Sequence, residues 1–155
     1  MDYVKDKLDI VTLYSGNKTI ELESSKFDLI YKALLVNYSL LVDKEPLANE
    51  MFNFTNGGKS VLGIYKKERG KIEKTVFSES TLWGINGRNT EQREAIELLM
   101  DQSIFLLCFM GVAGTGKTLL AIASALEQVV ERKLYKKIFI ARPVIPMGKD
   151  IGYLP

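Results

Sequence analysis

Short stretches of alternating apolar and polar residues dominate the first half of the chain. Alternation in Leu8–Tyr14 and Lys18–Glu23, on either side of Ser15-Gly16-Asn17, predicts a β-hairpin. Lys26–Val36 instead has the apolar spacing of a short amphipathic helix. Three further strands are predicted, with turn-rich connections between them: Met51–Thr55, Ser60–Tyr65 and Ile72–Phe77. We therefore expect residues 1–82 to form a small β-rich module.

The pattern changes after Trp83-Gly84. The predicted order is helix, strand, glycine-rich loop, helix, strand, with the regular elements at Thr90–Met100, Ile104–Met110, Leu119–Glu131 and Lys137–Ala141. A strand, a loop, a helix and a second strand make a βαβ unit, which implies parallel strands and a right-handed crossover. The predicted fold class is α/β, and residues 83–155 would begin a parallel sheet. Such a sheet needs both faces covered, so two strands alone predict a piece of a longer protein.

Composition narrows the chemistry. With one cysteine and no histidine, the chain excludes an intrachain disulfide, a Cys/His zinc site and a histidine base. Cys108 lies within the apolar run Ile104–Met110, which predicts a core position. The net charge of +2 identifies no partner. The charged N-terminus and the lack of a long apolar run predict a soluble, cytoplasmic protein without a membrane segment.

One motif carries chemistry, and it matches G-x-x-x-x-G-K-[ST] at every fixed position. Its residues are Gly111, Val112, Ala113, Gly114, Thr115, Gly116, Lys117 and Thr118. Glycines let backbone N–H groups approach phosphate oxygens at the start of a helix, whose dipole favours an anion. Lys117 would meet the β- and γ-phosphates, and the Thr118 hydroxyl would ligate Mg²⁺. Chance agreement is expected in roughly fewer than one chain in a hundred, so the motif predicts a site for a nucleoside triphosphate.

Two other residues have open interpretations. Gln92 either belongs to a capping box with Asn89 or pairs its carboxamide with the N6/N7 edge of adenine. Arg142 follows the second predicted strand, at the sheet edge where ligands bind. It would contact a phosphate there, or it is an ordinary loop arginine.

Several strings together resemble the PhoH family of P-loop ATPases, most closely the members with an N-terminal PIN ribonuclease domain. They are Trp83-Gly84-Ile85, Gly87–Arg93, Gly111–Thr118 and Ala141–Pro155. The segment from Asn49-Glu50 onward resembles, more weakly, the β-rich linker of those proteins.

The resemblance implies a RecA-like ATPase core related to helicases, which acts on RNA and often assembles as a ring. It implies ATP and Mg²⁺ as ligands, adenine recognition by Gln92, and a nucleic-acid or phosphate contact by Arg142.

Departures from the family pattern limit what the chain is expected to do alone. The Walker B acidic strand, the later arginine and the PIN carboxylates have no counterpart in this sequence. We therefore expect an ATP-binding segment with little or no hydrolysis of its own. Two alternatives remain: a nucleic-acid-binding β module on a non-hydrolysing nucleotide switch, and a small-molecule kinase, against which the family-like segment Ala141–Pro155 counts.

Overall fold

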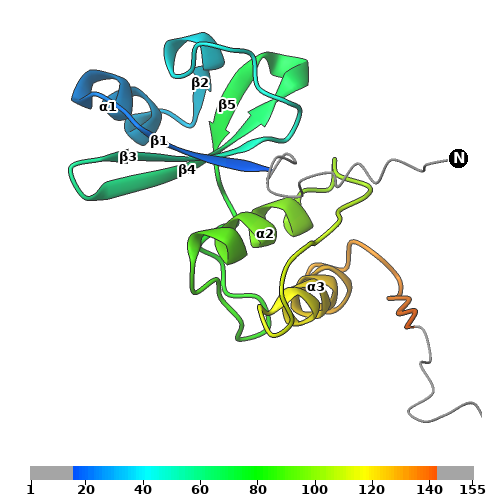
Figure 1. Ribbon diagram of the computed structural model, residues 1–155. Helices are drawn as coiled ribbons and strands as arrows, with labels where there is room; N and C mark the ends of the chain where they lie inside the picture. The colour runs from blue at the N-terminus through cyan, green and yellow to red at the C-terminus, as the bar shows by residue number, and fades with distance from the viewer. Residues whose placement is uncertain (1–15, 143–155) are drawn as a thin grey trace, which may run out of the picture.

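The computed structural model describes residues 16–142. Its main element is a five-stranded sheet with strand order β1-β3-β4-β5-β2 (Figure 1). The strands are β1 (Asn17–Glu21), β2 (Leu35–Asn37), β3 (Met51–Asn56), β4 (Lys59–Lys66) and β5 (Lys71–Lys74). β1 runs parallel to β3, whereas the other neighbouring pairs are antiparallel. The expected β-rich first half is therefore present.

The β3–β4 hairpin shows how the local sequence builds the sheet. Asn56 pairs with Lys59 across a two-residue turn formed by Gly57 and Gly58. Both glycines have positive φ, 52° and 83°, as the tight hairpin turn requires. The 3₁₀ turns η2 (Tyr38–Leu40) and η3 (Lys67–Arg69) connect other strands.

The first core lies between the sheet and helix α1 (Ser24–Lys32). Alternate residues of each strand point to the same face of the sheet, and on the face toward α1 these residues are large and apolar. Together with apolar residues of α1 and of the loops they form one cluster of buried side chains. They are Leu22, Phe27, Ile30, Val36, Leu41, Phe52, Phe54, Val61, Tyr65 and Ile72. The expected helix Lys26–Val36 thus ends early at Lys32, because Leu35–Asn37 pairs with β5 as an edge strand.

A second core joins helices α2 (Thr90–Met100) and α3 (Lys117–Leu126). It contains Leu82, Ala95, Ile96, Met100, Leu120 and Ala123. α3 continues into a π-helical turn, η4 (Glu127–Glu131), so the predicted helix Leu119–Glu131 is present with an altered last turn. α2 begins at Thr90 behind an Asn89 cap, as predicted. Figure 1 shows α1 and α2 on different sides of the sheet.

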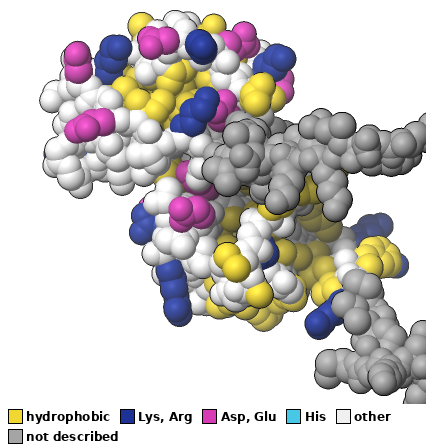
Figure 2. All heavy atoms as spheres, in the orientation of Figure 1, with side chains coloured by type: hydrophobic (Ala, Val, Ile, Leu, Met, Phe, Trp, Pro, Cys, Tyr) yellow, Lys and Arg dark blue, Asp and Glu magenta, His cyan; other side chains and the backbone are white. Residues whose placement is uncertain are grey.

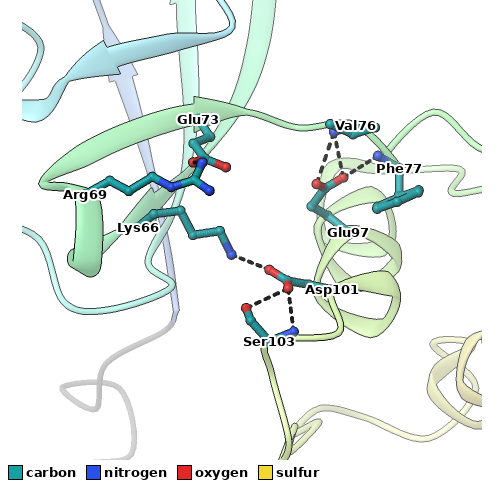
Figure 3. A network of polar contacts seen from close by, with 8 residues as sticks. All are labelled: Lys66, Arg69, Glu73, Val76, Phe77, Glu97, Asp101 and Ser103. Atoms are coloured by element: carbon teal, nitrogen blue, oxygen red, sulfur yellow. Dashed lines mark hydrogen bonds and ion pairs between the residues drawn. The ribbon is translucent and has the colours of Figure 1, made fainter.

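Polar contacts attach α2 to the sheet and to the chain that leaves β5 (Figure 3). The Glu97 carboxylate accepts hydrogen bonds from the backbone N–H groups of Val76, Phe77 and Ser78. Lys66 on β4 pairs with Asp101 at the end of α2. Burial by itself would raise the pKa of Asp101, but hydrogen bonds from Lys66 and Ser103 lower it below its usual 3.8. α2 is therefore fixed to the sheet along its second half.

The α/β class is confirmed, but two expected strands are not formed. Ile104–Met110 and Lys137–Ala141 form no strand within residues 16–142. A strand needs a hydrogen-bonding neighbour as well as an apolar sequence. Several apolar side chains are exposed here, Phe105 at 97% and Phe139 at 86%, although Phe109 packs against the second core. Figure 2 shows hydrophobic surface around α3 and the segment after it. The βαβ unit is thus absent from the described residues.

Two smaller expectations have different outcomes. Cys108 is exposed, so its predicted core position is wrong; the run around it has no sheet to bury it. In the predicted first hairpin, Leu8–Tyr14 lies outside the described residues, while Asn17–Glu21 is a strand that pairs with β3. Within residues 16–142, no helix has both the length and the apolar character of a membrane span.

Candidate functional site

The glycine loop Gly111–Thr118 leads directly into helix α3. α3 begins at Lys117, and its N-cap is Gly116, which adopts φ 86°. Glycine has no side chain to accept hydrogen bonds from the first-turn N–H groups, and no such cap bond is present. These donors, together with the positive end of the helix dipole, are the usual elements of an anion site.

Lys117 closes the loop on itself. Its Nζ donates to the backbone oxygens of Gly111 at 3.0 Å and Val112 at 2.6 Å, and to Thr115 Oγ1 at 2.9 Å. The Thr115 hydroxyl donates in turn to the Val112 oxygen at 3.0 Å. The ammonium group therefore lies inside the ring of the loop, where a phosphate oxygen could replace a carbonyl as its partner.

Two glycines need the conformations that the motif allows. Gly114 has φ 83° and Gly116 has φ 86°, a left-handed backbone that is costly for other residues. A Cβ on Gly116 would also lie 3.2 Å from Gln92 Nε2. The loop thus packs against α2 at a point where a larger residue would push the two apart.

Gln92 connects the loop to the start of α2. Its Nε2 donates to the Thr115 oxygen at 3.2 Å, and its Oε1 accepts from the Arg88 N–H at 2.9 Å. Its own N–H donates to Asn89 Oδ1 at 2.9 Å, which is the N-cap bond of the helix. Only half of the predicted capping box is formed: Asn89 caps the helix through the Gln92 N–H, but the Gln92 side chain accepts from Arg88 and not from the Asn89 N–H, and it bridges α2 to the loop.

A cleft of about 250 Å³ opens beside this bridge. It is lined by Gly84, Ile85, Asn86, Arg88, Gln92, Gly114, Gly116, Leu119 and Leu120. A tight turn fixes one wall, since Leu82 and Ile85 exchange hydrogen bonds of 2.7 and 2.8 Å across Trp83-Gly84. The cleft therefore lies directly beside the glycine loop, with Gly114 and Gly116 in its wall.

The Thr118 side chain is exposed and makes no hydrogen bond within residues 16–142. Its hydroxyl is therefore available as an oxygen ligand. No group of three or more acidic, cysteine or histidine side chains forms a metal site in the described part of the chain. Mg²⁺ commonly takes few protein oxygens and completes its shell with phosphates and water, so the residues present fit a nucleotide-bound Mg²⁺.

Arg142 is not brought to the loop. It is exposed and makes no hydrogen bond or ion pair among residues 16–142. Figure 1 shows the chain after η4 leading away from α3. The sheet edge that was to place Arg142 requires the strand Lys137–Ala141, which is not formed.

Sequence reasoning missed the walls of the cleft. Ile85, Asn86 and Leu119 line it, but no spacing in the sequence marks them. The glycine of Trp83-Gly84 is the one local sign of the turn that forms a cleft wall. Both residues have positive φ, 48° and 73°, a left-handed pair typical of a tight turn.

The fold and this loop define an α/β protein with a glycine loop shaped to hold an anion at a helix N-terminus. Comparison with known proteins makes the class more specific. The PhoH-like protein family matches residues 84–155. The resemblance to the PhoH family is thereby confirmed over residues 84–155.

Individual relatives agree with this assignment. Protein PhoH2 of Bacillus subtilis is 36% identical over 158 residues, covering 99% of this chain and 36% of that relative. Protein PhoH2 of Mycolicibacterium smegmatis is 42% identical over 81 residues, covering 52% of this chain and 18% of that relative. A PhoH-like protein of Synechocystis is 28% identical over 91 residues, covering 58% of this chain and 27% of that relative. The chain therefore spans little more than a third of these relatives at most, and no solved structure matches it.

Proposed function

We propose that the chain binds ATP with Mg²⁺ through Gly111–Thr118, as the nucleotide-binding segment of a PhoH-type ATPase that acts on RNA. The observation that carries the proposal is the position of Lys117 Nζ, held inside the loop by three oxygens at 2.6–3.0 Å. A cation enclosed by a glycine loop at a helix N-terminus is suited to polyphosphate. The match of residues 84–155 to the PhoH family supports the nucleotide as the ligand.

Each contact has a proposed partner on the nucleotide. Lys117 binds the β- and γ-phosphates, the first-turn N–H groups of α3 bind the same oxygens, and Thr118 ligates Mg²⁺. Adenine enters the cleft lined by Ile85 and Leu119, where the Gln92 carboxamide recognises its polar edge. Gln92 already bridges Arg88 and Thr115, so base and phosphate binding would rearrange one shared network.

Residues 16–142 provide the groups that bind the nucleotide, but not those that hydrolyse it. Phosphoryl transfer to water needs a group that holds the metal and orients the nucleophile, and the described residues contain no acidic cluster near Thr118 that could do both. We propose that hydrolysis and RNA coupling, with Arg142 as a nucleic-acid contact, belong to the whole protein. We propose likewise that this whole protein is cytoplasmic and forms a ring.

Helix α2 supplies a route for coupling the two halves of the chain. Its first turn contacts the loop through Gln92, and its last turns contact the sheet module through Glu97 and Asp101. A change of the loop on nucleotide binding would therefore reach the sheet through one rigid element.

Calorimetric titration of the chain with ATP and Mg²⁺ tests the proposal. Lys117→Ala should weaken binding about 10- to 100-fold, because hydrogen bonds to charged groups contribute about 1.5–3 kcal/mol. Lys136→Ala is the matched control, since Lys136 is exposed and has no hydrogen bond or ion pair within residues 16–142. Equal affinity of the two variants would contradict the proposal.

A further inference from the structure

An exposed tyrosine on the sheet module has a rigid support. Tyr31 lies in the last turn of α1, and 47% of it is exposed. Phe27 stacks on it with ring centroids 5.6 Å apart and an interplanar angle of 27°. Phe27 is itself a core residue, 3% exposed. The Tyr31 ring is therefore held in place by the core while part of it faces solvent.

Two lysines from different strands converge on this ring. Lys59 Nζ, at the start of β4, lies 5.9 Å from the ring centroid, and Lys74 Nζ, at the end of β5, lies 5.3 Å from it. Lys74 Nζ also donates to the Tyr31 backbone oxygen at 3.4 Å. Neither lysine has a carboxylate partner in residues 16–142. Two cations thus flank one ring, which attracts both, and no carboxylate of residues 16–142 neutralises them.

Apolar surface adjoins the cations. Leu34 is 76% exposed, and its backbone oxygen accepts from the Lys74 N–H at 2.9 Å, so the two residues are neighbours. An exposed aromatic ring beside two cations without a carboxylate partner supplies the elements with which proteins hold single-stranded nucleic acid: a base stacks on the ring, and phosphates meet the cations. The exposed Leu34 adds apolar surface next to them.

We propose that Tyr31, Lys59 and Lys74 form a binding site for single-stranded RNA on the sheet module. The proposal rests on the RNA part of the proposed function and places an RNA contact far in sequence from the glycine loop. On binding, the two ammonium groups move off the Tyr31 ring to meet the flanking phosphates, and one base takes their place on the ring face that Phe27 does not cover. The site takes unpaired strands, because a base within a duplex does not expose its face to an aromatic side chain.

Fluorescence anisotropy with a labelled oligouridylate, titrated with the full chain at several salt concentrations, tests this site. Tyr31→Ala should weaken binding about tenfold, whereas Tyr31→Phe, which keeps the ring, should bind like the wild type. Replacing both lysines, Lys59→Ala with Lys74→Ala, should lower the salt slope of the binding constant by about 1.4, from about 0.7 for each lost phosphate contact. Lys44→Ala with Lys67→Ala removes the same charge from exposed positions of the module and should leave the slope unchanged.

Three results would overturn the site. The first is RNA affinity equal to that of the wild type in both Tyr31→Ala and the double lysine variant. The second is a loss of salt slope in the Lys44/Lys67 control equal to that in the Lys59/Lys74 variant. The third is equal sensitivity of a base-free polyanion, such as polyphosphate, to Tyr31→Ala, which would indicate an acidic ligand of another kind. Parallel ATP titrations distinguish the two proposals. Absence of ATP binding by the wild-type chain would contradict the nucleotide function, whereas unchanged RNA binding by Tyr31→Ala would contradict this RNA site alone.

Discussion

Removing the Glu97 carboxylate should cost the protein a large share of its stability. Glu97 is 6% exposed, and it accepts from the N–H groups of Val76 at 3.0 Å, Phe77 at 2.5 Å and Ser78 at 2.9 Å. Glu97→Ala leaves these three donors without their acceptor. Glu97→Gln keeps one carbonyl oxygen and loses the charge. Glu97→Gln therefore measures the effect of losing the charge, and Glu97→Ala measures the effect of losing the whole acceptor group.

The magnitude follows from the burial of each donor. A buried donor left without a partner costs about 1–3 kcal/mol, and Ser78, 4% exposed, meets that condition. Val76 is 71% exposed, so water compensates part of the loss there and beside it. We expect Glu97→Ala to lower the free energy of unfolding by about 3 kcal/mol and Glu97→Gln by about 1–2 kcal/mol.

Urea denaturation followed by circular dichroism measures both values. With a slope of about 2 kcal/mol per M, the Glu97→Ala midpoint should fall by about 1.5 M. Glu131→Ala and Glu131→Gln are the controls, because Glu131 is exposed on η4 and should change stability by less than about 0.5 kcal/mol. A Glu97→Ala midpoint equal to that of Glu131→Ala would refute the anchoring role.

Three further predictions concern α2 and its start. Gln92→Ala should lower ATP affinity about tenfold and leave GTP affinity unchanged, since a bidentate carboxamide–adenine pair is worth about 1–3 kcal/mol; equal losses for both nucleotides in calorimetry would assign Gln92 to loop positioning alone. Gly87→Ala should destabilise the chain by about 1–3 kcal/mol in urea denaturation, because its Cβ would lie 2.8 Å from the Arg93 backbone nitrogen; an unchanged midpoint would contradict this packing. Burial raises the pKa of the Glu94 carboxyl above its usual 4.5, although the hydrogen bond from Asn17 acts in the opposite direction. The folded state therefore favours the protonated carboxyl. The contribution of Glu94 to stability is complete below pH 4.5 and is lost as the pH rises through the folded-state pKa. Glu94→Gln should therefore gain stability over the wild type as the pH rises from 4.5 toward neutrality; a stability difference that does not vary with pH would show that Glu94 has an ordinary pKa.

Local pattern predicted much of the fold where neighbours in the sequence are also neighbours in space. The β3–β4 hairpin follows from alternation on both sides of Gly57-Gly58, and α2 follows from its apolar spacing and its Asn89 cap. The run Ile104–Met110 fails for the opposite reason. Its composition is that of a buried strand, but strand formation depends on a partner that its own sequence does not specify.

The candidate site shows the same division. The position of Lys117 at the start of α3 follows from one continuous motif, so the sequence alone could predict it. The bond from Gln92 to Thr115 joins residues 23 positions apart, and the three donors of Glu97 lie 19–21 positions away. No periodicity encodes such contacts, because they arise from the packing of α2 against the loop and the sheet.

Amide chemical shifts of the ¹⁵N-labelled chain during titration with ATP and Mg²⁺ test the central claim most directly. We predict that the largest changes occur at the backbone amides of Gly114–Thr118 and at the Gln92 side-chain amide, and that both are lost in Lys117→Ala. Saturating nucleotide that leaves these amides unchanged, or shifts confined to other parts of the chain, would contradict nucleotide binding by this loop.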